Sequence, residues 1–322
     1  MKTLLVNPAW DAAGVSIRQA KAINKYTNCK ARHFRATPTF KYDTDITPEN
    51  YNVDEFISLI QESDIIHFCS ATYNYNTCTM NWGFDWKPLI KNKIIIFHDY
   101  CSFPGHWKDR AEAKDFWNRK KEMGWSAIFS SIPQAINIYK DCVYIPDIVD
   151  EKSDEFIVED RIFDKIRLCY FPTGGGNNKN QAEFSSALNI VSNTHKIETI
   201  ITSGQPNSIV INMKKRANLG FDALWREYHG MTTVENLALG IPTMCNISPE
   251  FIIEFNKFFQ TDFFPFKLVK NVDDIVICIS NYANNLDLLE MRSNTVRKFM
   301  VEHWSAENVA KRIVKEYEKL LG

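Results

Sequence analysis

The sequence lacks the features that mark several large classes of protein. Its 322 residues contain no internal repeat, no low-complexity segment and no run of about 18 apolar residues that could span a membrane. The eight cysteines form no C-x-x-C pair and no metal-ligand spacing, and several lie in apolar, strand-like segments. We therefore expect reduced, buried cysteines in a cytoplasmic protein.

The sequence also lacks a large excess of positive or negative charge. The net charge is −1, so no overall field attracts the chain to nucleic acid or to a membrane surface. The first residues are strand-like rather than basic and then apolar, so we expect no signal peptide. Hydrophobic residues make up 45% and charged residues 24%, which is typical of a globular protein.

Alternation of strands and helices dominates both halves of the chain. Short apolar segments separated by helical ones indicate parallel sheets covered on both faces. We expect a first Rossmann-like domain over residues 1–150 and a second over 151–301, with a last helix in 302–322 that packs back on the first. Residues 146–164 are the expected linker. Residues 203–222 show no clear pattern, and a helix-strand unit is expected to be trimmed there.

The most informative stretch runs from Glu227 to Pro242 and reads EYHGMTTVENLALGIP. It predicts a loop, a helix that Gly240 ends, and a strand that starts at Pro242. Thr232 or Thr233 is expected to cap this helix, with the next carboxylate in its first turn.

This helix start suits a phosphate and hydroxyl groups. The N–H groups of Gly230, Met231, Thr232 and Thr233 can receive a phosphate, and glycine lets a ligand approach the backbone closely. Glu235 can accept hydrogen bonds from a ribose diol. An ordinary capped helix start explains the same spacing.

The stretch resembles the Glu-x7-Glu signature of retaining GT-B glycosyltransferases, E-G-F-G-x-x-x-x-E-A-x-A-x-G-x-P. The matching residues are Glu227, Gly230, Glu235, Ala238, Gly240 and Pro242, and the departures are Tyr228, His229 and Asn236. The resemblance implies two Rossmann-like domains facing across a cleft, an α/β fold. It also implies that Glu227 contacts the donor sugar, and a viral or phage-type member is one form of the family that fits.

A glycine loop begins the second half of the chain. Gly174 and Gly175 with Lys179 can cradle phosphate, although the loop does not match the Walker pattern. In the similar family an arginine precedes this lysine, and here that position is glycine. Arg226, Lys214 or Lys215 would then supply the missing charge. A simple turn is the alternative.

Two positions in the first half complete the expected donor site. The resemblance implies that Gly14 lies in the loop that admits the diphosphate, and that His98 contacts the donor sugar. Each also has a plain explanation, a strand-to-helix turn for Gly14 and a structural role for His98. With Glu227 and Lys179, His98 forms the expected catalytic set.

No metal site is expected. Asp43 and Asp45 form a D-x-D match, but it lies in a polar, proline-flanked stretch rather than at the end of an apolar strand. We interpret the match as accidental and expect metal-independent chemistry.

A basic, tryptophan-containing segment over residues 105–121 is a candidate acceptor site. Trp107 with Arg119, Lys120 and Lys121 can stack bases and bind phosphates, or can belong to an ordinary solvated helix. Some viral relatives of the similar family glycosylate modified bases in DNA, which requires base flipping.

The resulting hypothesis is a retaining glycosyltransferase. It would use a UDP- or GDP-sugar as donor substrate and would need no cofactor. The acceptor of the sugar would be a saccharide, a lipid-linked or small molecule, or DNA with hydroxymethylated bases. The alternatives are a nucleotide-sugar epimerase and a non-catalytic module that binds nucleotide-sugar or nucleic acid.

Overall fold

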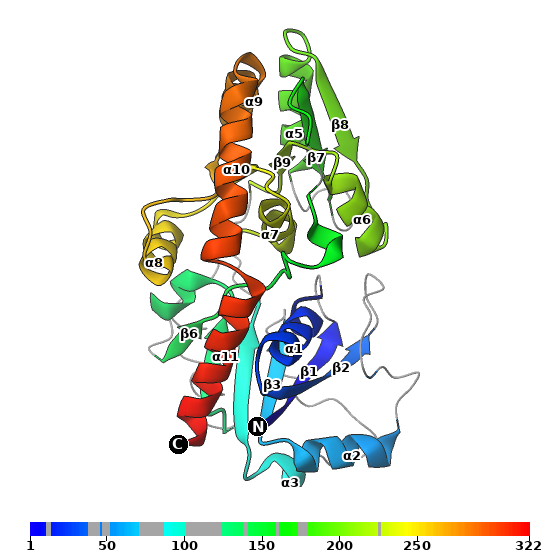
Figure 1. Ribbon diagram of the computed structural model, residues 1–322, viewed down its shortest axis with the longest axis vertical. Helices are drawn as coiled ribbons and strands as arrows, with labels where there is room; N and C mark the ends of the chain where they lie inside the picture. Colours follow the sequence, from blue (N-terminus) through cyan, green and yellow to red (C-terminus); the bar gives the residue numbers. More distant parts are fainter. Residues whose placement is uncertain are drawn as a thin grey trace. The chain divides into compact units, whose positions relative to one another are not determined.

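The computed structural model divides the chain into two compact units. Unit 1 comprises residues 1–148 and 306–322, and unit 2 comprises residues 149–305. Each unit is built on one parallel sheet with helices packed against it (Figure 1). The structure describes residues 1–10, 14–37, 46, 52–70, 87–100, 124–137, 141–158, 161–172, 180–224 and 227–322.

Unit 1 has a sheet of strand order β2-β1-β3-β4-β5-β6 in its described part. The strands are β1 (Lys2–Trp10), β2 (Lys30–Thr37), β3 (Ile65–Ser70), β4 (Ile94–Asp99), β5 (Ala127–Ser130) and β6 (Cys142–Tyr144). The helices are α1 (Val15–Tyr26), α2 (Val53–Glu62), α3 (Lys87–Ile90), the 3-10 helix η5 (Pro133–Asn137) and α11 (Ala306–Leu321). Although α11 is the last helix of the chain, it packs beside α1 (Figure 1).

The elements of unit 1 follow from local sequence. The Asn52 side chain accepts hydrogen bonds from the N–H groups of Asp54 and Glu55, which starts α2. Helix α11 has helical apolar spacing, and its Ile313 and Tyr317 are fully buried. The apolar face of α11 therefore completes the core of unit 1.

Unit 2 has a sheet of strand order β11-β10-β9-β7-β8 in its described part. The strands are β7 (Ile166–Tyr170), β8 (Ile197–Ile201), β9 (Leu219–Phe221), β10 (Thr243–Cys245) and β11 (Lys267–Leu268). The helices are α5 (Gln181–Val191), α6 (Asn207–Lys214), α7 (Met231–Ala238), α8 (Pro249–Phe259), α9 (Val272–Asn284), α10 (Leu286–Glu302) and the 3-10 helix η6 (Asp154–Phe156).

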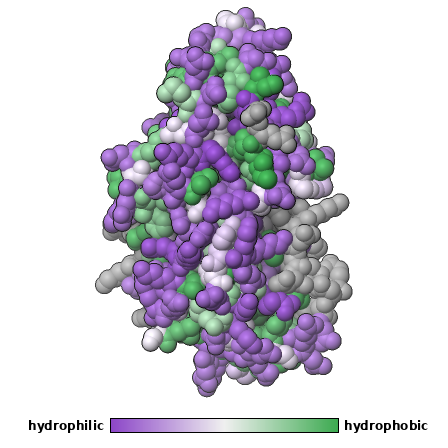
Figure 2. All heavy atoms as spheres, in the orientation of Figure 1, coloured by the Kyte–Doolittle hydropathy of each residue, from purple (hydrophilic) through white to green (hydrophobic). Residues whose placement is uncertain are grey.

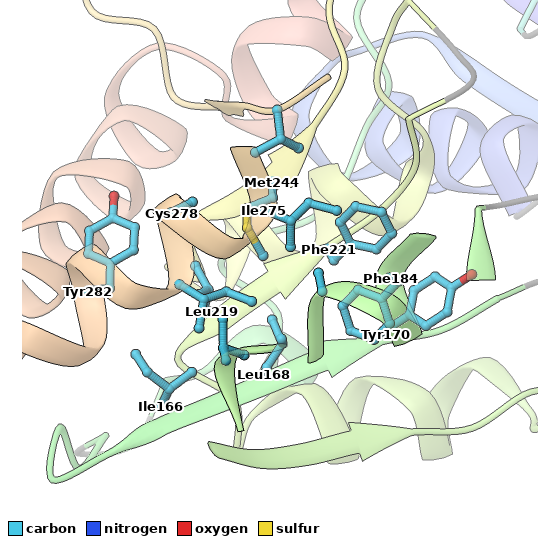
Figure 3. Packing of buried hydrophobic residues seen from close by; sticks show 14 of the residues in the cluster. Ile166, Leu168, Tyr170, Phe184, Leu219, Phe221, Met244, Ile275, Cys278 and Tyr282 are labelled. Atoms are coloured by element: carbon cyan, nitrogen blue, oxygen red, sulfur yellow. The ribbon is translucent and has the colours of Figure 1, made fainter. Parts of the chain in front are cut away.

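The core of unit 2 joins its sheet to α5 and α9. Tyr170 of β7, Phe184 of α5 and Phe221 of β9 form an aromatic group, with ring centroids 4.5 to 5.4 Å apart (Figure 3). Ile275 and Cys278 of α9 pack in the same cluster. This packing holds β7 next to β9, and the carboxyl ends of these two strands form the expected ligand position.

Several elements had no clear sequence pattern. Residues 203–222 form α6 and β9, one helix and one strand, and the expected trimming of a helix-strand unit there stays a prediction. The short strand Leu219–Phe221 is surrounded by polar residues, so its pattern is weak. The segment after β5 forms the 3-10 helix η5 within its described residues. Strand β2 and helix α8 had not been predicted at all.

The surface seen in Figure 2 is mainly hydrophilic, with separate hydrophobic patches. Within the described part of the chain, no helix combines the length and apolar character needed to cross a membrane.

Candidate functional site

The strand order of unit 2 reverses between β7 and β9. From β7 the chain goes outward to β8 and then returns to β9 on the other side. In open parallel sheets, ligands bind beyond the carboxyl ends of the strands at such a reversal. Phe171 and Asp222 follow those two strand ends directly, and α7 begins nine residues after Asp222. The Glu-x7-Glu stretch therefore lies at the expected ligand position of unit 2.

The beginning of α7 is held by Asp222. One oxygen of this carboxylate, Oδ2, accepts hydrogen bonds from the Gly230 N–H at 2.9 Å and the Thr233 hydroxyl at 2.8 Å. Gly230 is the N-cap residue, so the expectation of a capping threonine was wrong, and Thr232 and Thr233 lie within the helix. Glu235 consequently lies beyond the first turn.

The requirement for glycine at position 230 has a local cause. A Cβ atom there would lie 2.9 Å from Asp222 Oδ2 and would push the carboxylate away. An anion bound at this helix start would lie near the negative Asp222 carboxylate. The positive charge that balances the anion therefore has to come from neighbouring side chains.

Glu235 is buried in an ion pair. Its Oε2 lies 2.6 Å from Lys214 Nζ, and its Oε1 accepts a hydrogen bond from Asn207 at 3.0 Å. The Lys214 side chain is fully buried and also donates to the Thr232 carbonyl at 3.3 Å. Lys214 and Asn207 both belong to α6, so this helix orients the carboxylate of α7.

The end of α7 is held by two arginines. The Arg161 guanidinium donates to the carbonyls of Leu239 at 2.9 Å and Gly240 at 3.2 Å, and Arg297 donates to the carbonyl of Ala238. Burial lowers the pKa of Arg161 to about 10. Cations at a helix carboxyl end complement its dipole.

Gly240 ends α7 as the sequence predicted. Its φ of +71° is left-handed, its N–H bonds the Leu237 carbonyl, and the Ile241 N–H bonds the Asn236 carbonyl. These two hydrogen bonds form a Schellman motif. The helix is therefore fixed at both ends.

Glu227 and His229 flank the loop differently. Glu227 has an exposed side chain, while its carbonyl accepts the Ser248 N–H at 3.0 Å. His229 is buried among aromatic rings, with Phe266 stacked at 5.4 Å, and burial lowers its pKa to about 4. His229 thus packs where the similar family has phenylalanine, and Glu227 is the accessible carboxylate of the pair.

Unit 1 contains the other two described candidates. Gly14 has a φ of +68° and precedes α1, so its conformation favours glycine for the turn itself. His98 is fully buried near the end of β4, between His67 at 3.1 Å and Ser131 at 3.4 Å. Burial, and then the neighbouring His67, hold the pKa of His98 well below its ordinary value. His98 is thus a neutral, enclosed imidazole, and its sugar contact stays a prediction.

The remaining candidates lie outside the described residues: Gly174, Gly175, Lys179, Arg226, Trp107, Arg119, Lys120, Lys121, Asp43 and Asp45. Their roles stay predictions. In the part of the chain that the structure describes, no three or more acidic, histidine or cysteine side chains are grouped so that they could hold a metal ion.

Sequence reasoning missed Asp222, Asn207 and the two arginines at the end of α7. It named Lys214 only as a substitute phosphate ligand, whereas the structure pairs it with Glu235. An aspartate directly after a short strand was the one available signal for Asp222.

No protein-family model and no curated protein matches the chain. Solved structures do match. HepE from Anabaena in complex with UDP-glucose has a TM-score of 0.67 at 10% identity, covering 99% of this chain and 100% of the other. The chain has the GT-B fold.

Two further structures support the same fold. An alpha-glucosyltransferase in complex with UDP-glucose and DNA containing an abasic site has a TM-score of 0.63 at 10% identity, covering 100% and 99% of the two chains. Sucrose-phosphate synthase from Thermosynechococcus elongatus has a TM-score of 0.61 at 13% identity, also covering 100% and 99%. The GT-B fold therefore extends over the full length of the chain, as the resemblance in sequence implied.

Proposed function

We propose that the chain is a retaining glycosyltransferase that moves a sugar from a nucleotide-sugar to a hydroxyl acceptor. The observation that carries this proposal is the Glu235 carboxylate, which Lys214 and Asn207 hold at the strand reversal of unit 2 in a GT-B fold. Unit 2 would bind the donor and unit 1 the acceptor. No cofactor is needed, because the donor itself carries the activated bond.

The donor is proposed to be a UDP-sugar, because solved structures with this fold contain UDP-glucose. Glu235 accepts hydrogen bonds from the ribose diol, and Lys214 neutralises its charge so that the carboxylate does not repel the diphosphate. Lys214 is therefore not the missing phosphate ligand. That role falls to Lys179 and Arg226, since the Gly230 N–H already donates to Asp222 and the Thr233 N–H to the Gly230 carbonyl.

Bond cleavage builds negative charge on the leaving diphosphate. Lys179 and Arg226 stabilise this charge, while the exposed Glu227 side chain contacts the donor sugar. In a front-face reaction the leaving phosphate accepts the acceptor proton, so Glu227 does not have to act as a base.

A binding screen followed by a transfer assay tests the proposal. We expect UDP or a UDP-sugar to raise the thermal unfolding midpoint, since a ligand that binds the folded state stabilises it. We also expect labelled sugar to move from donor to a hydroxyl acceptor with retained anomeric configuration. Release of free or epimerised sugar without acceptor would favour the epimerase, and binding without any turnover would favour the non-catalytic module.

DNA is the second candidate acceptor. Two solved structures of the same fold are alpha-glucosyltransferases in complex with DNA, one of them with an HMU base. Trp107, Arg119, Lys120 and Lys121 would hold the strand, with binding that weakens steeply as salt rises. Transfer to a hydroxymethylated but not a plain duplex, lost on changing the three basic residues to Glu, supports this acceptor. Transfer only to saccharides or small molecules removes it.

We further propose that the enzyme is cytoplasmic. The six cysteines in the described part of the chain are buried thiols, which agrees with a reducing compartment.

A further inference from the structure

A chain of buried side chains crosses unit 1 beneath α11. Tyr317 of α11 lies 2.5 Å from His67 Nδ1 of β3, and His67 Nε2 lies 3.1 Å from His98 Nδ1 of β4. His98 Nε2 lies 3.4 Å from the Ser131 hydroxyl, directly after β5. Gln19 of α1 joins from the side, with its amide nitrogen 3.5 Å from His98 Nδ1. All five side chains are buried, so leaving any of these hydrogen bonds unmade would cost free energy.

Gln19 sets the direction of this chain. Its amide oxygen accepts the Tyr100 hydroxyl at 3.3 Å, so its amide nitrogen faces His98. An amide nitrogen only donates, and His98 Nδ1 must therefore be an acceptor. A neutral imidazole has one donor and one acceptor nitrogen, which places the proton of His98 on Nε2.

The remaining bonds then have one consistent arrangement. His67 donates from Nε2 to His98 Nδ1, so His67 Nδ1 accepts from the Tyr317 hydroxyl. Burial lowers the pKa of His67 to about 3 and holds the pKa of His98 lower than its ordinary value, which keeps both rings neutral. Every proton points away from α11 and toward the carboxyl ends of β4 and β5.

We propose that Tyr317 and His67 are positioning residues that hold His98 in its Nε2–H tautomer. His98 then donates from Nε2 to the Ser131 oxygen, which leaves the Ser131 hydroxyl proton to donate at the carboxyl ends of β4 and β5, where ligands of open sheets bind. A donor at this place suits an oxygen atom of a sugar, and the arrangement gives His98 no role as a base. The sugar as ligand rests on the proposed function, whereas the tautomer does not.

The tautomers can be read directly by NMR of protein labelled with ¹⁵N-histidine, without any substrate. Long-range ¹H–¹⁵N correlations distinguish Nδ1–H from Nε2–H, and His67→Asn and His98→Asn variants assign the signals. We expect Nε2–H for both rings in the unmodified protein. A proton on Nδ1 of His98 would overturn the proposal, and this readout requires neither substrate nor activity.

A Tyr317→Phe variant tests the positioning role. It removes only the hydroxyl, so we expect His67 and His98 to become mixtures of tautomers, while Tyr282→Phe in unit 2 leaves both unchanged. Unaltered tautomers in Tyr317→Phe overturn the proposed role of α11. In the transfer assay we expect about a tenfold loss of turnover, the effect of one weakened hydrogen bond to a ligand. Tautomers as expected in a protein without transferase activity would contradict the proposed function alone.

Discussion

In unit 2 buried ions hold α7 in place, whereas the chain of side chains buried beneath α11 in unit 1 is neutral throughout. Lys214 faces Glu235, and Arg161 faces helix carbonyls, so each ion has a fixed partner. His67 and His98 depend instead on which nitrogen carries a proton. The Glu235 carboxylate in unit 2 suits a ribose diol, and a neutral donor in unit 1 suits a sugar oxygen. The difference agrees with a donor whose nucleoside binds unit 2.

The largest expected effect concerns the buried ion pair. Lys214→Met leaves the Glu235 carboxylate buried without its cation, which should cost about 3–5 kcal/mol of unfolding free energy. The double variant Lys214→Met/Glu235→Leu should recover much of this loss, because no buried charge remains. Urea titration measures both values.

Nucleotide affinity separates stability from recognition. Calorimetry should show that the double variant, although more stable than Lys214→Met, does not bind UDP. If the double variant binds UDP like the unmodified protein, Glu235 does not hold the ribose.

Acid should act more strongly on unit 1. The pKa values of His33 and His67 are lowered to about 3, mainly by burial, and that of His98 is also depressed, whereas in unit 2 His229 is shifted to about 4. Since the folded pKa lies below the unfolded value, stability is complete above about pH 6.5 and is lost as pH falls. Each buried histidine contributes up to about 1.4 kcal/mol per pH unit.

Urea titrations at pH 7.5, 6.5 and 5.5, followed through backbone NMR signals of each unit, measure this difference. We expect the midpoint of unit 1 to fall more steeply than that of unit 2. If the urea midpoints of the two units fall equally with pH, the buried neutral histidines do not make unit 1 more sensitive to acid than unit 2.

A smaller effect is expected at the end of α7. Gly240 and Gly204 have φ values of +71° and +70°, but a Cβ at Gly240 would lie 3.1 Å from the Arg297 Cβ, while nothing lies within 4 Å at Gly204. Gly204→Ala should cost about 1–2 kcal/mol for the left-handed conformation alone. Gly240→Ala should cost more, and equal losses in thermal or urea unfolding would show that the arginine contact adds nothing.

The smallest expected effect is that of a chelator. The charge of the leaving diphosphate is proposed to be met by Lys179 and Arg226, so EDTA should leave transfer unchanged. Asp43→Asn/Asp45→Asn is the matched variant. If EDTA abolishes activity and manganese or magnesium restores it, the D-x-D match would have to be a metal site.

Much of this fold follows from local patterns. The strand-to-helix turn considered for Gly14 directly precedes α1, and the expected last helix within residues 302–322 is α11, which packs beside α1. Gly240 predicted the end of α7, because few residues other than glycine adopt its left-handed backbone conformation. Such features depend on residues close in sequence.

The site was harder to predict because its contacts span the chain. Asp222 meets Gly230 eight residues later, and Lys214 meets Glu235 across 21 residues, with no periodic pattern to connect them. The threonines after Gly230 looked like caps, but Gly230 is the N-cap residue, and a carboxylate from a neighbouring strand end accepts its N–H and the Thr233 hydroxyl. The His67–Tyr317 contact joins residues 250 positions apart.

That last contact also bears on how the protein is made. Ribosomes release the chain from its first residue onward, and domains usually fold in that order. Unit 1 departs from this order, because α11 is synthesised only after all of unit 2. Until then α1 lacks its neighbour and His67 lacks the Tyr317 hydroxyl. The first unit to emerge is therefore the last to be completed.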